Sequence, residues 1–206
     1  MRLSTLPLLI APFLANAQPT VGLLQINPTN LDGYVLFAPI PSNTTWLIDK
    51  CGQEVHSWSS AYKPGDAVYL LENGQLLRTG NTNNTAFNCF GKGGAFQLRD
   101  AASNVLWEVL VSDAQRCQHH DVRALPNGNV LAIVWEKKTI AQATDAGRDP
   151  ALLGTELWTE AILELQPIGT DSAAVVWQWH LWDHLVQDFD ALQANYGVVS
   201  DHPELV

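Results

Sequence analysis

The chain has 206 residues, a mass of 22.6 kDa, a formal net charge of −10 and a pI near 4.8. Its eleven Lys and Arg residues are too few and too scattered to neutralise a phosphate backbone, which argues against nucleic-acid binding. A phosphate-binding loop of the form GxxxxGK[ST] is also excluded, because Gly91-Lys92-Gly93-Gly94 lacks the following Ser or Thr. We expect these glycines to form a turn at the edge of a strand.

The first 17 residues have the organisation of a signal peptide. Met1-Arg2 supplies a positive start, residues 3–14 are largely apolar, and Ala15-Asn16-Ala17 matches the small-x-small pattern before a cleavage site. The apolar run is too short and too rich in proline to span a bilayer. We therefore expect residues 18–206 to be exported to a periplasm or to the exterior, without a membrane span.

A repeat of about fifty residues runs through the exported part. Residues 46–58 read as a strand, a turn and a strand that ends in a tryptophan, and residues 96–107 and 162–179 repeat this hairpin. A second hairpin, with an Asn-Gly turn, occurs at 68–77 and again 54 residues later at 118–131. Short strands and turns at this period predict an all-β fold, a β-propeller of which about three blades lie in this chain.

The interval between the second and third hairpins is longer by about twenty residues. Residues 136–160 account for the excess as a polar segment that contains glycine and proline. Insertions of this kind usually form loops over one rim of a repeat protein. We expect 136–160 to be such a loop.

Three cysteines lie in the exported part: Cys51, Cys89 and Cys117. An odd number is unusual for an oxidising compartment. We expect one disulfide, with Cys89–Cys117 as the favoured pair, which leaves Cys51 free or paired with a cysteine outside this sequence. No Cys/His spacing in the chain suggests a metal site.

His119-His120-Asp121 precedes the strand that turns at Asn127-Gly128. Because side chains alternate along a strand, we expect the two imidazoles to point to opposite faces, one packed and one open to a cavity. The repeat places the pair opposite Gly65 and Asp66. His119 and His120 are candidate catalytic residues; in the alternative interpretation, one imidazole bonds a neighbouring blade and Asp121 ties a turn.

Tryptophans gather near the end of the third hairpin. Residues 175–188 begin as a strand and change to helical spacing, and we expect Asp183 to cap the short helix. Trp177 and Trp179 fit a structural role between adjacent blades. Trp182 and His184 are candidates to line an aromatic substrate pocket.

Several of these segments together resemble one protein family. They are the opening 33–39, the turn 47–52, His119-His120-Asp121, Trp182-Asp183-His184 and the segment 195–204. In this order they are similar to the bacterial aryl-sulfate sulfotransferases, and the similarity extends from about Gly33 to the last residue.

The resemblance implies a fold and a reaction. The fold would be a six-bladed propeller, and the protein would be periplasmic or secreted. The reaction would move a sulfuryl group from a phenolic sulfate ester to a phenol, by a ping-pong mechanism through a sulfated histidine, without cofactor, metal or nucleotide donor. His119 and His120 would supply catalytic imidazole, and Asp121, Trp182 and His184 would contribute to substrate binding.

The resemblance also predicts what this chain does not contain. In the family, a His-x-Asn element, an arginine and the histidine that carries the sulfuryl group follow the region matched here. We therefore expect this chain to be the N-terminal portion of a longer protein and to be inactive by itself.

Two other classes of function fit the same sequence. A non-catalytic secreted propeller module would bind a partner or glycan through exposed tryptophan and would tolerate substitution of His119 or His120. A different propeller enzyme, such as a quinoprotein-like dehydrogenase or a lyase, would show cofactor absorbance or metal dependence.

Overall fold

The computed structural model describes residues 32–91 and 93–206, so the predicted signal peptide at 1–17 lies outside the described residues. Within them the chain forms three antiparallel sheets, none of which closes on itself. The strands of the first sheet are β1 (Val35–Phe37), β2 (Thr44–Ile48) and β3 (Glu54–Ser59). Those of the second are β4 (Lys63–Leu70), β5 (Leu76–Asn81), β6 (Gly94–Arg99) and β7 (Val105–Leu110). Those of the third are β8 (Arg116–Ala124), β9 (Val130–Lys138), β10 (Leu157–Ile168) and β11 (Ser172–His180).

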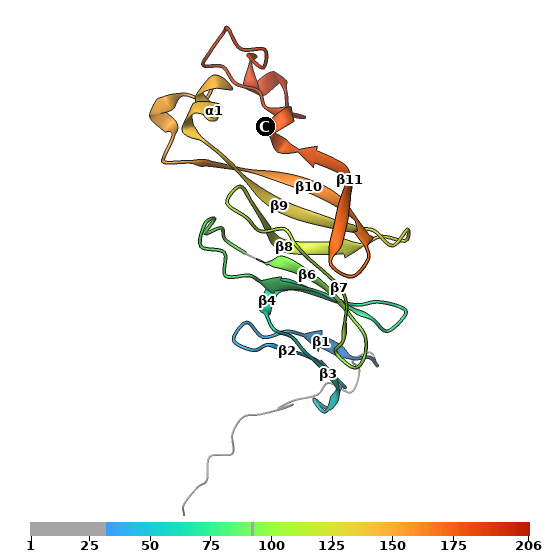
Figure 1. Ribbon diagram of the computed structural model, residues 1–206. Coiled ribbons are helices and arrows are strands. Elements are labelled where there is room, and N and C mark those ends of the chain that lie inside the picture. The colour runs from blue at the N-terminus through green and yellow to red at the C-terminus, as the bar shows by residue number, and fades with distance from the viewer. Residues whose placement is uncertain (1–31, 92) are drawn as a thin grey trace, which may run out of the picture.

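Each sheet is a meander in which every strand pairs with the next strand of the chain. The sheets are stacked in chain order, with the β4–β7 sheet between the other two (Figure 1). The first strands of the second and third sheets, β4 and β8, lie against each other. The expected all-β fold is confirmed at this level.

The repeat is confirmed by two turns that have the same backbone hydrogen bond and the same glycine conformation. In the β4–β5 turn the N–H of Leu71 donates to the Gln75 carbonyl over 2.8 Å, and in the β8–β9 turn Leu125 donates to Asn129 over the same distance. Gly74 and Gly128 have φ of 81° and 85°, a left-handed conformation that glycine adopts without strain. The two Asn-Gly hairpins are therefore equivalent pieces of structure.

The main apolar core lies between the second and third sheets. Alternate residues of β9 and β10 point into it, as period-2 patterning requires. These residues are Val130, Ala132, Val134, Ala161, Leu163 and Leu165. Phe96 and Trp107 meet them from the second sheet, and the Trp107 indole N–H donates to the Ser172 carbonyl over 2.7 Å. The two four-stranded sheets thus share one core.

Two expectations for the second half need correction. The 136–160 segment is only partly a loop, because β9 continues to Lys138 and β10 starts at Leu157. Between these strands lie the helix α1 (Ile140–Asp145) and the 3-10 turn η1 (Pro150–Leu152). The expected helix after β11 is a single 3-10 turn, η2 (Leu181–His184), and Asp183 does not cap it. Trp177 is 48% exposed on β11, the outer strand of the last sheet among the described residues, so its expected role between adjacent blades stays a prediction.

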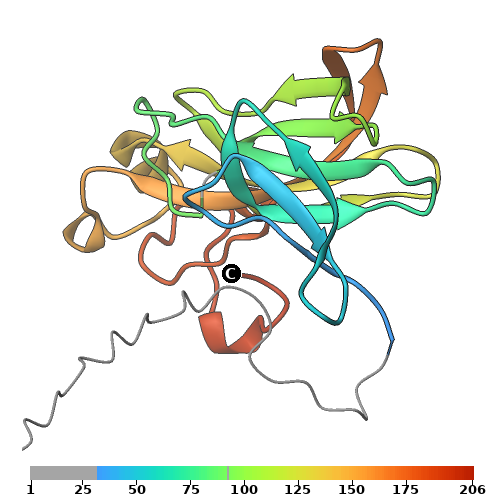
Figure 2. The same ribbon diagram turned by 90° about the horizontal axis from the view of Figure 1, so that it is seen from below.

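The C-terminal segment after η2 contains a last 3-10 turn, η3 (Val199–Asp201), drawn in red in Figure 2. This segment reaches the end of α1, where the Asn195 side-chain amide donates to the Ala146 carbonyl over 2.9 Å (Figure 1). None of the helices in the described part of the chain has the length and apolar character that crossing a bilayer requires.

Candidate functional site

The predicted His119-His120-Asp121 motif lies in a β-bulge. The pairing of β8 with β9 shifts register between Gln118 and Val122, and His120 takes a left-handed backbone with φ of 50°. Strand β4 has the equivalent shift between Pro64 and Val68, where Asp66 has φ of 77°. The alignment of the histidine pair with Gly65 and Asp66 is therefore confirmed. A left-handed non-glycine residue carries backbone strain, which folded proteins tend to keep at functional positions.

The prediction that the two imidazoles point to opposite faces is wrong. Their Nδ1 atoms lie 2.8 Å apart, within hydrogen-bond distance, and the rings are perpendicular with centroids 5.1 Å apart. The cause is the bulge, because an extra residue with positive φ breaks the alternation of side chains. The motif therefore presents two coupled imidazoles.

The two rings differ sharply in exposure. His119 is 3% exposed and its ring stacks on Trp135 at 4.4 Å, whereas His120 is exposed. Burial lowers the pKa of His119 to about 4, and the neighbouring His120 acts in the same direction. Glu160 Oε1 lies 3.9 Å from His119 Nε2 without forming a hydrogen bond. His119 is therefore a neutral imidazole near pH 7, linked through Nδ1 to a ring that faces solvent.

The 82–93 loop, which connects β5 to β6, supports the bulge from the outside. The His120 N–H donates to the Gly91 carbonyl over 2.8 Å, and the Gly93 N–H donates to the Gln118 carbonyl over 2.9 Å. A Cβ atom at Gly91 would collide with the His120 imidazole, and Gly91 itself has φ of 58°. The glycine turn expected at a strand edge thus supports His120: the Gly91 carbonyl accepts its N–H, and the absent side chain leaves room for its imidazole.

Aromatic side chains continue outward from His119. The Trp135 ring lies 6.1 Å from that of Trp158, which packs edge-on against Phe87 at 4.9 Å. Phe90 lies 6.0 Å from Trp158 and is 77% exposed. The imidazole pair therefore has an apolar wall on one side and open surface on the other.

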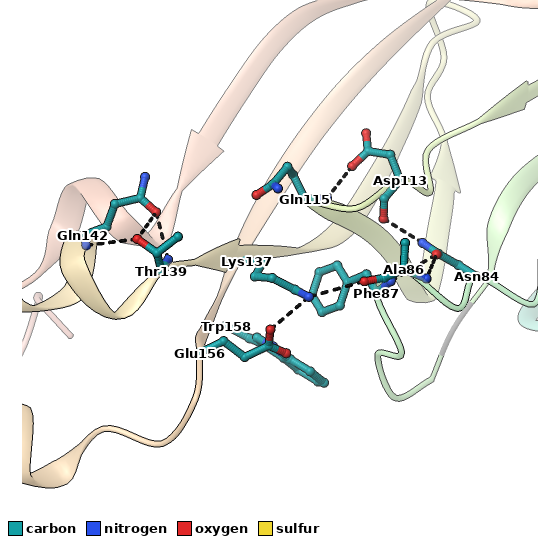
Figure 3. A network of polar contacts seen from close by, with 10 residues as sticks. All are labelled: Asn84, Ala86, Phe87, Asp113, Gln115, Lys137, Thr139, Gln142, Glu156 and Trp158. Atoms are coloured by element: carbon teal, nitrogen blue, oxygen red, sulfur yellow. Dashed lines mark hydrogen bonds and ion pairs between the residues drawn. The ribbon is translucent and has the colours of Figure 1, made fainter.

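Besides the hydrogen bonds that join the 82–93 loop to the third sheet, two other links attach it there. One is the disulfide Cys89–Cys117, which confirms the favoured pairing, and Cys51 is free and exposed. Lys137 supplies the other (Figure 3): its Nζ lies 2.9 Å from Glu156 Oε2, donates to the Ala86 carbonyl over 3.4 Å, and sits 4.7 Å from the centre of the Phe87 ring. The loop that carries Gly91 is therefore attached to the third sheet by the disulfide and by the contacts of Lys137.

Asp121, predicted to bind substrate, joins two sheets. Its Oδ1 accepts a hydrogen bond of 2.7 Å from the Tyr69 hydroxyl on β4 and one of 2.8 Å from the Val122 N–H. The hydrogen bond to Asp121 is the main reason that the pKa of Tyr69 is raised. The carboxylate therefore fixes the end of the bulge.

Trp182 and His184 lie elsewhere. His184 stacks on Trp179 with ring centroids 4.9 Å apart, and the Trp182 ring lies 5.1 Å from Lys138 Nζ. Among the described residues neither side chain makes a hydrogen bond, ion pair or ring contact with His119, His120 or Asp121. Trp182 instead lines a separate cavity next to α1. The structure thus brings together His119, His120 and Asp121 but not the two aromatic-site residues.

Residues 32–91 and 93–206 contain no group of three or more His, Cys, Asp or Glu placed to hold a metal ion.

Comparison with known proteins returned no relative: no family model matches the chain, and no curated protein is significantly similar to it.

Sequence reasoning missed Gly91, Trp135 and Glu160 as neighbours of the imidazole pair. One signal for Gly91 was present, because Cys89 is two residues before it and Cys117 is two residues before His119. A Cys89–Cys117 bond therefore requires the glycine turn and the histidines to lie close together. Trp135 and Glu160 depend on the register of β8, β9 and β10, in which Cys117, Trp135 and Glu160 form one row.

Proposed function

We propose that this chain belongs to a nucleotide-independent aryl-sulfate sulfotransferase, with the His119–His120 pair in its active site. The observation that carries the proposal is the pair itself: a buried neutral imidazole joined at 2.8 Å to an exposed one on a strained bulge. The sequence resemblance supplies the reaction, and the geometry is suited to proton transfer between a phenol and an imidazole.

The two histidines have different parts in the proposal. His120 is the catalytic residue, because its ring is exposed and no hydrogen bond within the described chain occupies its Nε2. His119 is a positioning residue: its ring is fixed by Trp135 and its Nδ1 holds the Nδ1 of His120. When the neutral His119 ring accepts through Nδ1, the proton of His120 lies on Nδ1 and its Nε2 lone pair faces the substrate.

The chemistry then balances in two half-reactions. In the first, the aryl O–S bond breaks, the sulfuryl group passes to a nucleophilic histidine elsewhere in the protein, and protonated His120 gives its Nε2 proton to the leaving phenolate, which returns His120 to its neutral form. In the second, the Nε2 lone pair of His120 accepts the proton of the acceptor phenol, its oxygen bonds to sulfur, and the N–S bond breaks. The exposed Phe90 ring beside Trp158 offers an apolar surface for either aryl group.

We also propose that the protein acts outside the cytoplasm, in a periplasm or secreted. The Cys89–Cys117 disulfide supports this, because such bonds persist in oxidising compartments. The fold proposed for the complete protein is a six-bladed propeller, to which the three stacked meanders contribute.

The test uses the protein as its host makes it, with 4-nitrophenyl sulfate as donor, phenol as acceptor, EDTA present and nucleotides absent. We expect release of 4-nitrophenol that depends on phenol, with parallel lines in double-reciprocal plots. His119→Ala combined with His120→Ala should lower the rate at least about 100-fold, whereas His202→Gln, a half-buried histidine near the C-terminus, should not.

Two outcomes would overturn the proposal. If the variant that lacks both His119 and His120 transferred sulfate at the normal rate, these histidines would not form the active site. Binding of aryl sulfate without turnover would favour a non-catalytic binding module, and a rate that needs a metal ion or a quinone would favour the other enzyme class.

A further inference from the structure

One ring nitrogen of the imidazole pair has no partner in the described part of the chain. His119 Nδ1 lies 2.8 Å from His120 Nδ1, whereas His119 Nε2 is buried and makes no hydrogen bond to a described residue. Leaving a buried polar atom without a partner costs free energy, and most such atoms in proteins are hydrogen-bonded. Because this atom is closed to bulk solvent, a partner for it has to come from within the protein.

Glu160 places a carboxylate next to this nitrogen. Its Oε1 lies 3.9 Å from His119 Nε2, about 1 Å more than a hydrogen bond between a ring N–H and a carboxylate. The strand register explains the approach, because Cys117, Trp135 and Glu160 are paired across β8, β9 and β10 and so share one face of the sheet. The His119 ring stacks on Trp135 over this face, with Nε2 toward Glu160.

A small movement of Glu160 closes the remaining gap. Its side chain is 44% exposed, which leaves it room to turn, whereas the His119 side chain is 3% exposed and fixed by its neighbours. Hydrogen bonds that serve catalysis are often long in a protein without substrate and shorten when the substrate binds. The 3.9 Å separation is therefore compatible with a hydrogen bond in the working protein.

A carboxylate at this place distinguishes the two neutral tautomers of the pair. In the first tautomer, His119 carries its proton on Nε2, where Glu160 accepts it, and its Nδ1 accepts the Nδ1–H of His120. In the second, the Nε2 lone pair of His119 faces the carboxylate, so that two acceptors oppose each other. Glu160 thus favours the first tautomer, in which His120 keeps its Nε2 lone pair for a substrate.

We propose that Glu160 is a positioning residue, which accepts the Nε2–H of His119 and thereby fixes the tautomers of both imidazoles. When His120 Nε2 takes up the proton of a phenol, its Nδ1–H stays bonded to His119, and the hydrogen-bonded chain that ends at Glu160 stabilises the imidazolium. The part of Glu160 in catalysis rests on the proposed function. The tautomers need no substrate and are measured without one.

Nuclear magnetic resonance of the full chain labelled with nitrogen-15 tests the tautomers directly. The protonated and the bare nitrogen of a neutral imidazole have separate chemical shifts, which are read at about pH 8, above the ordinary pKa of histidine. We expect Nε2–H on His119 and Nδ1–H on His120. Glu160→Leu fills the space without an acceptor, so the Nε2–H would be buried unbonded. In this variant we expect the reverse, Nδ1–H on His119 and Nε2–H on His120.

Two further variants serve as controls. Glu160→Gln keeps a side-chain carbonyl that accepts the N–H, and it should retain the wild-type tautomers. Glu164→Leu removes the same charge from the same strand, but that carboxylate accepts hydrogen bonds from Asn127 and Asn129, so the histidine pair should not change. Wild-type tautomers in a folded Glu160→Leu protein would overturn the proposal, as would reversed tautomers in the wild type or in Glu160→Gln.

The transfer assay separates this inference from the proposed function. With 4-nitrophenyl sulfate and phenol, Glu160→Leu should lower kcat at least about tenfold and change KM for the donor by less than about twofold, because Glu160 acts on the base and not on the substrate. Glu160→Gln should recover most of the rate. A protein with the expected tautomers but no transfer would contradict the proposed function alone. A normal kcat in Glu160→Leu with reversed tautomers would overturn the part of Glu160 in catalysis.

Discussion

The fold strongly alters the ionisation of His119. Its pKa falls to about 4 from an ordinary 6.5, because the charged imidazolium is poorly solvated in its buried position. Between these two values the unfolded chain binds more protons than the folded one, so stability is present above pH 6.5 and is lost as the pH falls toward 4. The full difference amounts to about 3 kcal/mol, at 1.36 kcal/mol for each pKa unit.

This gives the first prediction. Urea unfolding of the wild type should show stability falling between pH 6.5 and 4, and His119→Gln should make that fall shallower, because glutamine does not take up the proton. Val176→Ala, which removes no titratable group, serves as the control and should leave the slope unchanged. An unchanged slope in His119→Gln would show that His119 is not the neutral buried group described here.

The close packing of Gly91 against the His120 imidazole leads to a second prediction. Gly91→Ala places a methyl group where the imidazole now lies, so we expect the ring to be displaced and phenol-dependent transfer to fall at least about tenfold. Gly74→Ala is the matched control, because Gly74 has a similar positive φ of 81° and nothing within 4 Å of an added Cβ. Both variants should lose about 1 kcal/mol of stability from backbone strain. Equal activity of the two proteins would contradict the role of Gly91.

At the scale of elements, the 82–93 loop depends on its attachments. Gly91 and Gly93 join the loop to β8 by backbone hydrogen bonds, and Cys89 and Cys117 tie it to β8 across 28 residues of chain. Closing a loop of this length stabilises a protein by about 3.6 kcal/mol, mainly by restricting the unfolded chain.

We predict that Cys89→Ala combined with Cys117→Ala lowers the free energy of unfolding by about this amount, as measured by urea denaturation. Cys51→Ala should have no effect, because that thiol is free and exposed. A double variant as stable as the wild type would show that the hydrogen bonds, Lys137 and the aromatic contacts hold the loop without the disulfide.

Elements with a repeated turn could be predicted from the sequence, and the bulge could not. The Asn-Gly turns at residues 73 and 127 need glycine at a positive φ, which the sequence states directly. The extra residue at His120 depends instead on β8 pairing with β9 on one side and meeting Gly91 on the other. A local pattern does not contain that information, so alternation placed the two rings on opposite faces.

The aromatic surroundings were hidden for a related reason. Trp135 reaches His119 because the register of three strands puts it beside Cys117. Likewise, α1 sits within a segment that reads as polar insertion, and its capping box of Thr139 and Gln142 is a short signal in a region without apolar periodicity. The strand register that places Trp135 beside His119 cannot be read from a single sequence, and the capping box alone is too short a signal to predict α1.

At the scale of the molecule, the second and third sheets are predicted to unfold together because they share one core. Leu163 is 1% exposed between them, and Leu163→Ala should cost about 3 kcal/mol through lost burial and a residual cavity. Val176→Ala on the outer strand β11, where the side chain is 49% exposed, should change stability by less than about 0.5 kcal/mol. Near- and far-ultraviolet circular dichroism should report the same transition, and two separate transitions would show independent sheets.

The central claim is that the exposed imidazole of the bulge performs the chemistry, and His120→Asn tests it most directly. Asparagine tolerates the left-handed backbone at this position, so the bulge should persist while the imidazole is lost. Asp66→Asn, at the equivalent left-handed position of β4, is the control. With 4-nitrophenyl sulfate and phenol, we predict that His120→Asn remains folded and transfers at least about 100-fold more slowly, while Asp66→Asn transfers at the wild-type rate. A folded His120→Asn protein that keeps the wild-type rate would contradict the account.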